Sequence, residues 1–198
     1  MRKDETAAVS RDRCQSGQLG GLSDHELMAL LGDGCREALA ELVRRHQGAV
    51  LSLARRFLGR DELAEDVCQE AFVRVFQQAG RYRPTASFST WLYRIVSNLC
   101  WDQRRRAARA PAALEHDAPD EAPEPSVAGQ RDELRQRVRQ AVAALPDRQR
   151  LALVMHRFCG MGHSEIAAAT GWSPKAVESC LTRAYATLRR QLADLEQS

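Results

Sequence analysis

The densest group of side chains that could do chemistry lies between Ser87 and Arg109, in the stretch SFSTWLYRIVSNLCWDQRRRAAR. Guanidiniums this close together repel one another unless a polyanion neutralises them, and their planar fork fits phosphate. This pattern therefore indicates nucleic acid as a partner. The alternative is a solvated helix end, where positive charge favours the negative pole of the helix dipole. The four arginines are Arg104, Arg105, Arg106 and Arg109.

Apolar residues recur at helical spacing through this stretch and predict one amphipathic helix with a face packed inward. On that spacing Trp91 is expected to pack in the core, whereas Trp101 is balanced between core and surface. Polar neighbours of the apolar face are expected nearer the rim. The apolar set is Phe88, Trp91, Leu92, Ile95 and Leu99, and the rim set is Tyr93, Arg94, Ser97 and Asn98.

Composition is ordinary for a soluble globular protein: of 198 residues, 44% are apolar and 28% are charged, with a net charge of +3. The six cysteines lie far apart with no CxxC pair, which argues against a disulfide framework and fits a reducing compartment. Residues 1–22 carry charge throughout and indicate a flexible leader rather than a signal peptide, and no later run approaches membrane-spanning length. We expect a cytoplasmic protein with no membrane insertion of its own.

Three further helices are predicted before the arginine-rich one. Ser23 can cap a short helix that breaks at Gly32 to Gly34, and an amphipathic segment from Arg36 to Leu58 ends at Gly59. The segment 61–78 has an apolar stripe and an acidic flank, which without further context is a solvated helix face. Residues 23–109 are therefore expected to form one compact all-α unit.

Residues 110–130 differ in kind, because they combine four prolines with five acidic residues. Such a segment cannot bury a core, so it is expected to stay extended as a linker. Its negative charge either serves solubility or occupies a basic channel of a partner.

Helical periodicity resumes at Asp132 and is interrupted at Pro146. Beyond residue 158, SEIAAATGWSPKAVESCLTRAYATLRR predicts a helix-turn-helix, with a turn at Gly171 and a second helix capped by Ser173 with Pro174 in its first position. The second helix of this motif enters the major groove by its N-terminal part. A helical hairpin used for protein contact is the alternative. The outward residues are Lys175, Ala176, Glu178, Ser179, Thr182 and Arg183.

Three stretches in this order resemble the extracytoplasmic-function sigma factors, small bacterial initiation factors of the sigma-70 family that keep conserved regions 2 and 4. DELAEDVCQEAFVRVF resembles the core-polymerase-binding helix, FSTWLYRIVSNLCWDQRRR the melting and minus-ten segment, and LPDRQRLALVMHRFCGMGHSEIAAATGWSPKAVESCLTRA the minus-thirty-five helix-turn-helix. The resemblance covers residues 23–109 and 132–192. It implies an all-α fold of two small domains, region 2 over 23–109 and region 4 over 131–194, joined by the flexible acidic linker.

Carried over residue by residue, the resemblance implies three binding surfaces. Asp66, Gln69, Glu70 and Phe72 correspond to positions that engage the clamp helices of the large subunit of core RNA polymerase. Asn98 is similar to the residue near a flipped base of the minus-ten element, where an amide can donate and accept hydrogen bonds. The minus-ten set is Trp91, Arg94, Asn98, Arg104, Arg105, Arg106 and Arg109, and the minus-thirty-five set is Ser173, Lys175, Ala176, Glu178, Ser179, Thr182 and Arg183.

The family also implies an anti-sigma factor as inhibitory partner, nucleoid association when active, and possible retention at the membrane by that inhibitor. The chain departs from the family pattern at two places in the predicted minus-thirty-five surface. Cys180 stands where an arginine is common, and residues 161–163 differ from the usual polar turn. No phosphate loop, nucleophile elbow or HExxH helix is present, so the sequence predicts neither an enzyme nor a cofactor.

Other functions stay open at this point. A stand-alone operator-binding regulator would bind duplex DNA by itself, often as a dimer on a palindrome. An adaptor without a DNA role would lack the steep salt dependence of phosphate contacts. His156, Cys159 and His163 form a conceivable metal or redox site, but their irregular spacing favours no metal.

Overall fold

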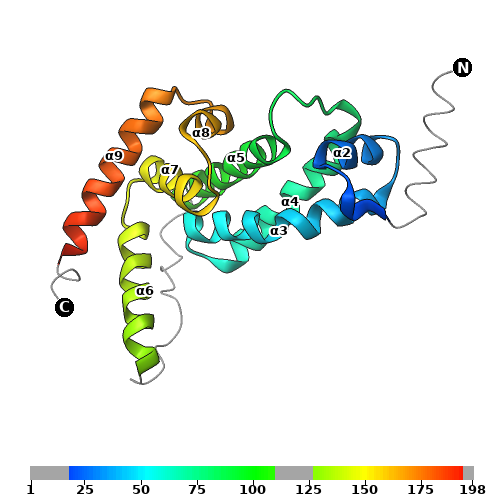
Figure 1. Ribbon diagram of the computed structural model, residues 1–198. Helices are drawn as coiled ribbons and strands as arrows, with labels where there is room; N and C mark the ends of the chain where they lie inside the picture. The colour runs from blue at the N-terminus through cyan, green and yellow to red at the C-terminus, as the bar shows by residue number, and fades with distance from the viewer. Residues whose placement is uncertain (1–17, 110–126, 194–198) are drawn as a thin grey trace, which may run out of the picture.

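The computed structural model describes residues 18–109 and 127–193, and every regular element within them is a helix (Figure 1). The all-α prediction is therefore confirmed. No helix in the described ranges is long and apolar enough to span a bilayer. The elements are η1 (Gln18–Gly21), α2 (Asp24–Gly32), α3 (Arg36–Leu58), α4 (Asp61–Gln78), η2 (Ala79–Arg81), α5 (Phe88–Arg109), α6 (Val127–Ala143), α7 (Asp147–Phe158), α8 (His163–Thr170) and α9 (Pro174–Gln191).

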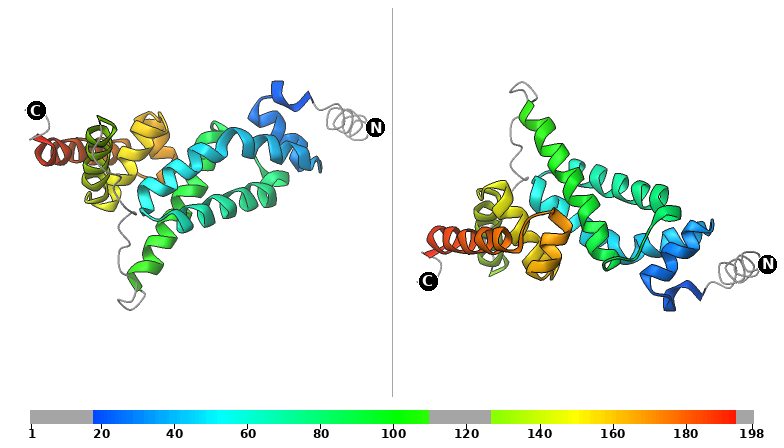
Figure 2. Two further views of the ribbon diagram at one scale, coloured as in Figure 1. Left: turned by 90° about the horizontal axis from the view of Figure 1, so that it is seen from below. Right: turned by 90° about the horizontal axis from the view of Figure 1, so that it is seen from above.

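Helices α2 to α5 make a first module, in which α3, α4 and α5 pack pairwise and α2 lies on α3 (Figure 2). The apolar stripes predicted from helical spacing supply its core, where Leu42, Phe57, Val67 and Leu92 are at most 1% exposed. Trp101 meets Phe57 edge to face with ring centroids 5.4 Å apart, so this tryptophan packs rather than facing a ligand.

Helix ends in the first module follow the predicted capping residues. Ser23 forms a capping box with Glu26: its backbone N–H donates to Glu26 Oε2 at 2.7 Å, and its hydroxyl accepts from the Glu26 N–H at 3.3 Å. Gly59 ends α3 with φ of 74°, a left-handed conformation that costs glycine little. These residues therefore set the start of α2 and the end of α3.

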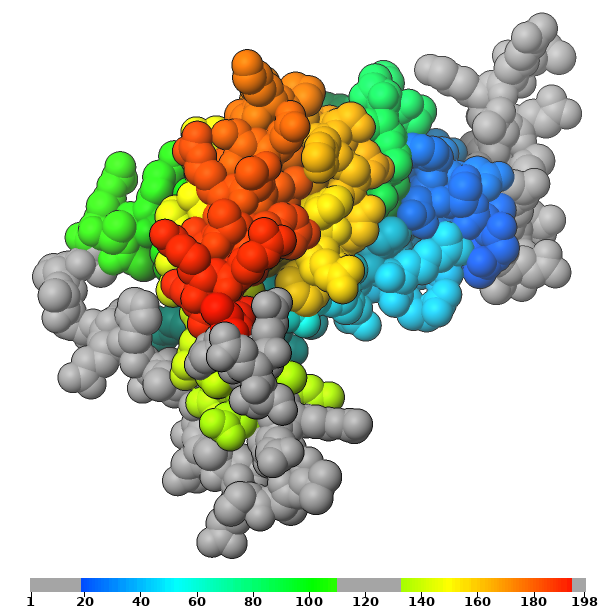
Figure 3. Space-filling view, turned by 60° about the vertical axis from the view of Figure 1, so that its left-hand side comes forward, coloured from blue at the N-terminus to red at the C-terminus, as the bar shows by residue number. Residues whose placement is uncertain are grey.

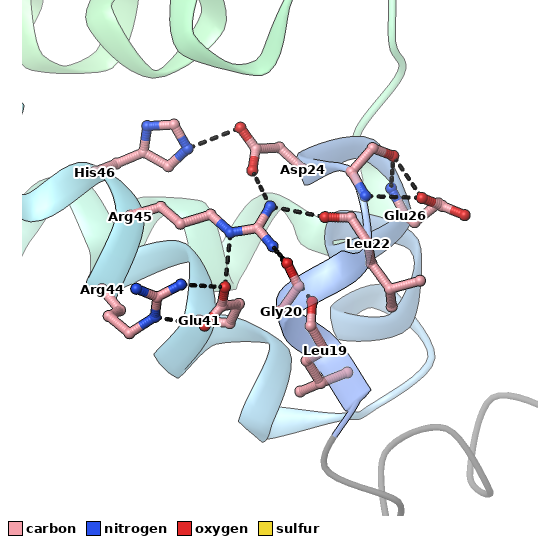
Figure 4. A network of polar contacts seen from close by, with 10 residues as sticks. Leu19, Gly20, Leu22, Asp24, Glu26, Glu41, Arg44, Arg45 and His46 are labelled. Carbon is pink, nitrogen blue, oxygen red and sulfur yellow. Dashed lines mark hydrogen bonds and ion pairs between the residues drawn. The ribbon is translucent and has the colours of Figure 1, made fainter.

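Arg45 of α3 ties the N-terminal segment to the module through the network drawn in Figure 4. Its guanidinium donates to backbone oxygens around η1 and to two carboxylates, one of which is also bound by Arg44. The hydrogen bonds from the two arginines lower the pKa of Glu41 to about 2, so this carboxylate is ionised at neutral pH. The distances from Arg45 are 2.7 Å to Leu22 O, 2.8 Å to Gly20 O, 2.9 Å to Asp24 Oδ1 and 2.7 Å to Glu41 Oε1.

Helices α6 to α9 make a second module. The hydroxyl of Ser173 accepts from the Ala176 N–H at 3.2 Å, and Pro174 is the first residue of α9, so the predicted cap is confirmed. Gly171 turns the chain between α8 and α9 with φ of 74°. Helix α6 begins at Val127, inside the segment 110–130 that was expected to be extended. No proline stands between residue 126 and Pro146, so nothing in the side chains stops the helix from starting early.

The two modules pack directly on each other, with α8 against α5 and α7 against α3 (Figures 1 and 2). One cluster of buried apolar side chains runs through both modules. Tyr93 and Ser97, expected near the rim of α5, are 6% and 1% exposed because the second module covers that face. The hydroxyl of Ser97 lies 3.5 Å from Ala169 O of α8.

Candidate nucleic-acid interface

An exposed stripe runs along α5. Arg94 and Asn98 are exposed on this stripe, while Ser97 and Leu99 on either side of Asn98 are buried. Within the described residues, neither the Arg94 nor the Asn98 side chain has a hydrogen-bond partner in the protein. Burial of the flanking residues fixes the direction in which Asn98 points, so its amide is presented to a ligand by a rigid helix.

An aromatic cluster lies at the N-terminal end of this stripe. Trp91 is half-buried and meets Tyr82 edge to face at 4.9 Å and Phe88 at 5.8 Å between centroids. Tyr82 Oη lies 2.7 Å from His25 Nδ1 of α2. Trp91 therefore packs against the core, as its spacing predicted, and keeps part of its surface exposed.

The four arginines of the run meet different surroundings. Arg104 makes a two-pronged ion pair with Asp147 of α7, with Nη2–Oδ1 of 2.6 Å and Nε–Oδ2 of 3.2 Å. Arg105 pairs with Asp102 on its own helix. Arg106 and Arg109 are exposed. Only part of the predicted basic end is therefore ready for phosphate in this arrangement.

A polar hollow of about 390 Å³ lies between the middle of α4 and the C-terminal half of α5. Arg106 lines it together with Asp66 and Glu70, which the resemblance assigns to polymerase binding. Arg106 thus lies next to residues predicted to bind polymerase as well as in the arginine run predicted to bind DNA. Sequence spacing alone could not bring these residues of different helices together.

The acidic flank of α4 is exposed and continuous. Asp66, Gln69 and Glu70 face solvent, and Glu70 receives the Arg74 guanidinium at 2.8 Å. Phe72, predicted with them, is 7% exposed and packs into the core, so it supports this surface and offers a partner little area.

Two apolar side chains on α4 were missed by sequence reasoning. Val73 and Phe76 are each 46% exposed. They fall outside the buried stripe of their helix, which is the signal that could have identified them. Exposed apolar groups bordered by acids are typical of a protein-binding surface.

The helix-turn-helix presents α9 along an uncovered face, where α9 (orange to red) and α8 (gold) lie side by side in Figure 3. Lys175, Glu178 and Thr182 are exposed at spacings of three and four residues and so share one face. Ala176 and Ser179 are half-buried beside them, and Arg183 donates to the Ser179 hydroxyl at 3.1 Å. Ser173 is exposed but already engaged as the cap of α9.

A second hollow, of about 630 Å³ and with a basic lining, lies between α7 and the C-terminal half of α9. Three guanidiniums line it, and their charge and shape suit DNA phosphates. Helix α9 therefore continues its positive surface beyond the predicted set. The three are Arg183, Arg189 and Arg190.

The cysteines and histidines of the second module do not converge. His156 Nδ1 lies 2.9 Å from Met161 O, and its ring meets the His163 ring at 5.6 Å, whereas Cys159 packs against the apolar core. Burial raises the pKa of Cys159 to about 11, which keeps it a protonated thiol. Within the described ranges no three histidine, cysteine or acidic residues are grouped as metal ligands.

The described cysteines differ in their redox state. Cys68, Cys100, Cys159 and Cys180 are free thiols. Cys35 takes part in a disulfide. This bond differs from the prediction made from the sequence, where the wide spacing of the cysteines argued against a disulfide framework.

Comparison with known proteins assigns both modules. Residues 42–110 match Sigma-70 region 2, and residues 135–188 match Sigma-70 region 4. The RNA polymerase sigma-H factor of Pseudomonas aeruginosa is 30% identical over 185 residues, which cover 87% of this chain and 95% of the relative. The ECF RNA polymerase sigma factor SigM of Mycobacterium tuberculosis is 35% identical over 173 residues, covering 87% and 86%.

Solved structures agree with this assignment. CnrH, solved in complex with the cytosolic domain of CnrY, matches with a TM-score of 0.66 and 29% identity, covering 86% of this chain and 97% of that one. The sigma factor RpoE of Bartonella quintana, solved with the anti-sigma factor NepR, shares the fold with a TM-score of 0.61 at 18% identity, covering 78% and 96%.

A two-module helical protein with these matches is a transcription initiation factor rather than an enzyme. The chain belongs to the extracytoplasmic-function sigma factors of the sigma-70 family, as the sequence predicted. Its C-terminal helix-turn-helix is the DNA-binding region 4.

Proposed function

We propose that the chain binds core RNA polymerase through α4, captures the non-template strand of the minus-ten element on the outer stripe of α5, and reads the minus-thirty-five element with α9. The observation that carries this proposal is the presentation of Asn98. Its amide is exposed and unpartnered among the described residues, between two buried neighbours. An amide held in a fixed direction can form hydrogen bonds with the edge of an unpaired base. A helix face that only contacts solvent would not require its polar side chains to be held in this way.

Each module has its own binding function in this proposal. Residues 23–109 bind polymerase and the minus-ten element, residues 131–194 bind the minus-thirty-five element, and the acidic segment between them links the two. A stand-alone operator-binding regulator would use α9 alone and would leave the acidic and apolar surface of α4 without a role. Run-off transcription decides between the two, because a sigma factor makes transcription depend on the chain together with core polymerase.

An anti-sigma factor completes the proposal. Both structural relatives were solved in complex with a second protein, and one of these proteins is an anti-sigma factor by name. An inhibitor that binds this chain would keep it in the cytoplasm or at the membrane until a signal releases it to the nucleoid. Co-purification of the chain from its own cells, with identification of the bound protein, tests this partner.

Reversal of the charge at Glu70 tests the polymerase surface. We expect Glu70→Lys to weaken binding to core polymerase at least tenfold, because a basic partner would lose a charge-assisted bond and gain repulsion. Affinity is measured by competition for core with a labelled wild-type chain.

Glu62→Lys is the matched control, because it makes the same charge change at another exposed position on α4. It should stay within about threefold of wild type, since isolated surface charges contribute little. Equal loss in both variants would show a non-specific charge effect and remove the assignment of Glu70.

Removal of Lys175 tests the minus-thirty-five surface. If its ammonium binds a phosphate, Lys175→Ala should weaken binding of duplex promoter DNA to the same degree for every DNA sequence. The slope of the logarithm of the binding constant against the logarithm of the salt concentration should become less steep by about 1. Arg139→Ala, at an exposed position on α6, should leave the slope unchanged. Loss confined to one promoter sequence would instead make Lys175 a base-reading residue.

A further inference from the structure

The polar hollow between α4 and α5 has both acidic and apolar walls. Asp66 and Glu70 of α4 line it at a spacing of four residues, and Asp102 of α5 adds a third carboxylate. Val67 and Leu99, which are 1% and 7% exposed, line it as well. Lysine and arginine carry a charged group on an aliphatic stem, so their side chains suit a hollow with both kinds of wall.

Two arginines of the chain itself share the hollow with these carboxylates. Arg74 of α4 already binds Glu70, with Nε 2.8 Å from Oε1. Arg106 of α5 is exposed and forms no hydrogen bond or ion pair with another described residue. Asp66 is also exposed and likewise has no such partner among the described residues. The hollow therefore offers an unpaired carboxylate to an incoming cation, but it already holds a competing positive charge.

Other occupants fit the hollow less well. DNA phosphates would be repelled by its three carboxylates. Within the part of the chain that the structure describes, no three acidic, histidine or cysteine side chains are arranged to hold a metal ion. The chemistry of the walls thus selects a basic side chain of a protein partner. Because Asp66 and Glu70 belong to the polymerase surface proposed above, that partner is core polymerase.

We propose that the hollow receives a lysine or arginine side chain of core polymerase, that Asp102 is a polymerase-binding residue on α5, and that Arg106 opposes this contact through its charge. The proposal rests on the proposed function, because it extends the polymerase surface of α4 onto a second helix. Charge-assisted hydrogen bonds to the carboxylates favour the incoming cation, whereas the charge of Arg106 in the same hollow repels it. Asp102 lies four residues from Asn98 on α5, so polymerase bound at Asp102 would adjoin the amide proposed to bind a base.

Removal of the Asp102 charge tests the new contact. We expect Asp102→Asn to weaken binding to core polymerase about fivefold in the absence of DNA, because the partner's cation loses a charge-assisted bond. Competition with a labelled wild-type chain measures the affinity. Asp61→Asn is the matched control, since it makes the same change at an exposed position of α4 outside the hollow and should stay within about twofold of wild type. Both variants should unfold in urea at the wild-type midpoint, because each loses only a surface ion pair.

A double variant separates a direct contact from an indirect charge effect. Asp102 pairs with Arg105 on its own helix, so loss of the carboxylate releases a positive charge that would by itself repel a basic partner. If Asp102 contacts polymerase, Asp102→Asn combined with Arg105→Gln should still bind core about threefold more weakly than wild type. Recovery of wild-type affinity in the double variant would show that the released Arg105 caused the loss, and it would overturn the contact.

Removal of the Arg106 charge should change the affinity in the opposite direction. Arg106→Gln should tighten core binding about two- to fivefold in the absence of DNA, because exposed charges make small contributions. Arg36→Gln makes the same charge change at an exposed position of α3 and should leave core binding unchanged. Unchanged or weaker core binding of Arg106→Gln would overturn its role as a competitor.

The Glu70→Lys variant distinguishes failure of this contact from failure of the proposed function. If Glu70→Lys weakens core binding and Asp102→Asn does not, the polymerase surface is confined to α4 and the hollow receives no side chain of polymerase. If the wild-type chain does not bind core polymerase, or if Glu70→Lys binds as tightly as wild type, the assignment of the α4 surface fails first. All of these variants are compared in the same competition assay.

Discussion

Asn98→Ala is expected to slow promoter opening about ten- to a hundredfold while leaving the affinity for core polymerase within twofold. A well-placed amide contributes about 1–3 kcal/mol to the recognition of one base, and this contribution is lost when the amide is removed. Asn98 is exposed and flanked by buried residues, so truncation should not disturb the helix. Permanganate reactivity of thymines in the melted region measures opening, and competition for core measures binding.

The control for this variant is Gln47→Ala, which removes an exposed amide from the interior of α3. It should open promoters at the wild-type rate. Asn98→Gln should recover only part of the activity, because the longer side chain places the amide about 1.5 Å further from the helix. Transcription from Asn98→Ala equal to wild type would refute the base-capture role.

Arg150→Met is expected to lower the free energy of unfolding by about 3 kcal/mol. Burial and the nearby charge of Arg104 lower the pKa of Arg150, yet arginine stays charged at any physiological pH, so its hydrogen bonds are charge-assisted. Besides Phe57 O and Leu145 O, the guanidinium binds Ala143 O, and the substitution leaves these carbonyls unpaired inside the protein. Urea unfolding followed by circular dichroism measures the change.

Arg148→Met is the matched control, because it makes the same substitution at an exposed arginine on the same helix. Arg148 is exposed and its guanidinium lies 4.5 Å from the centre of the Trp172 ring, a contact that contributes up to about 1 kcal/mol. Arg148→Met should therefore cost clearly less than Arg150→Met. Similar losses in the two variants would mean that the buried hydrogen bonds of Arg150 contribute nothing beyond those of a surface arginine.

Local signals predicted the helices closely because the residues that start and stop them act over short range. Ser23, Gly59, Ser173 and Pro174 set ends that the structure reproduces. The order of regions 2 and 4 was likewise readable, since each region is carried by one continuous stretch of sequence. Helical spacing also predicted correctly that Trp91 packs against the core.

Contacts between distant parts of the chain were not predictable in this way. Tyr93 and Ser97 are polar residues at the edge of an apolar stripe, and their spacing places them at the rim of α5 when that helix is considered alone. They are buried because the second module covers them, and no local pattern encodes that contact. Phe158 is a second case: this aromatic side chain at the end of α7 is 41% exposed and lies beneath the Arg56 guanidinium of α3, a contact that no local pattern encodes.

The apolar cluster shared by the two modules bears on whether the protein aggregates in the cell. Side chains such as Tyr93 are buried only because the neighbouring module covers them. Separation of the modules would therefore expose apolar surface on both. Exposed apolar surface of this kind promotes aggregation unless another macromolecule covers it. A chain that folds back on itself can therefore accumulate in surplus over polymerase and remain dispersed as single copies until it is needed.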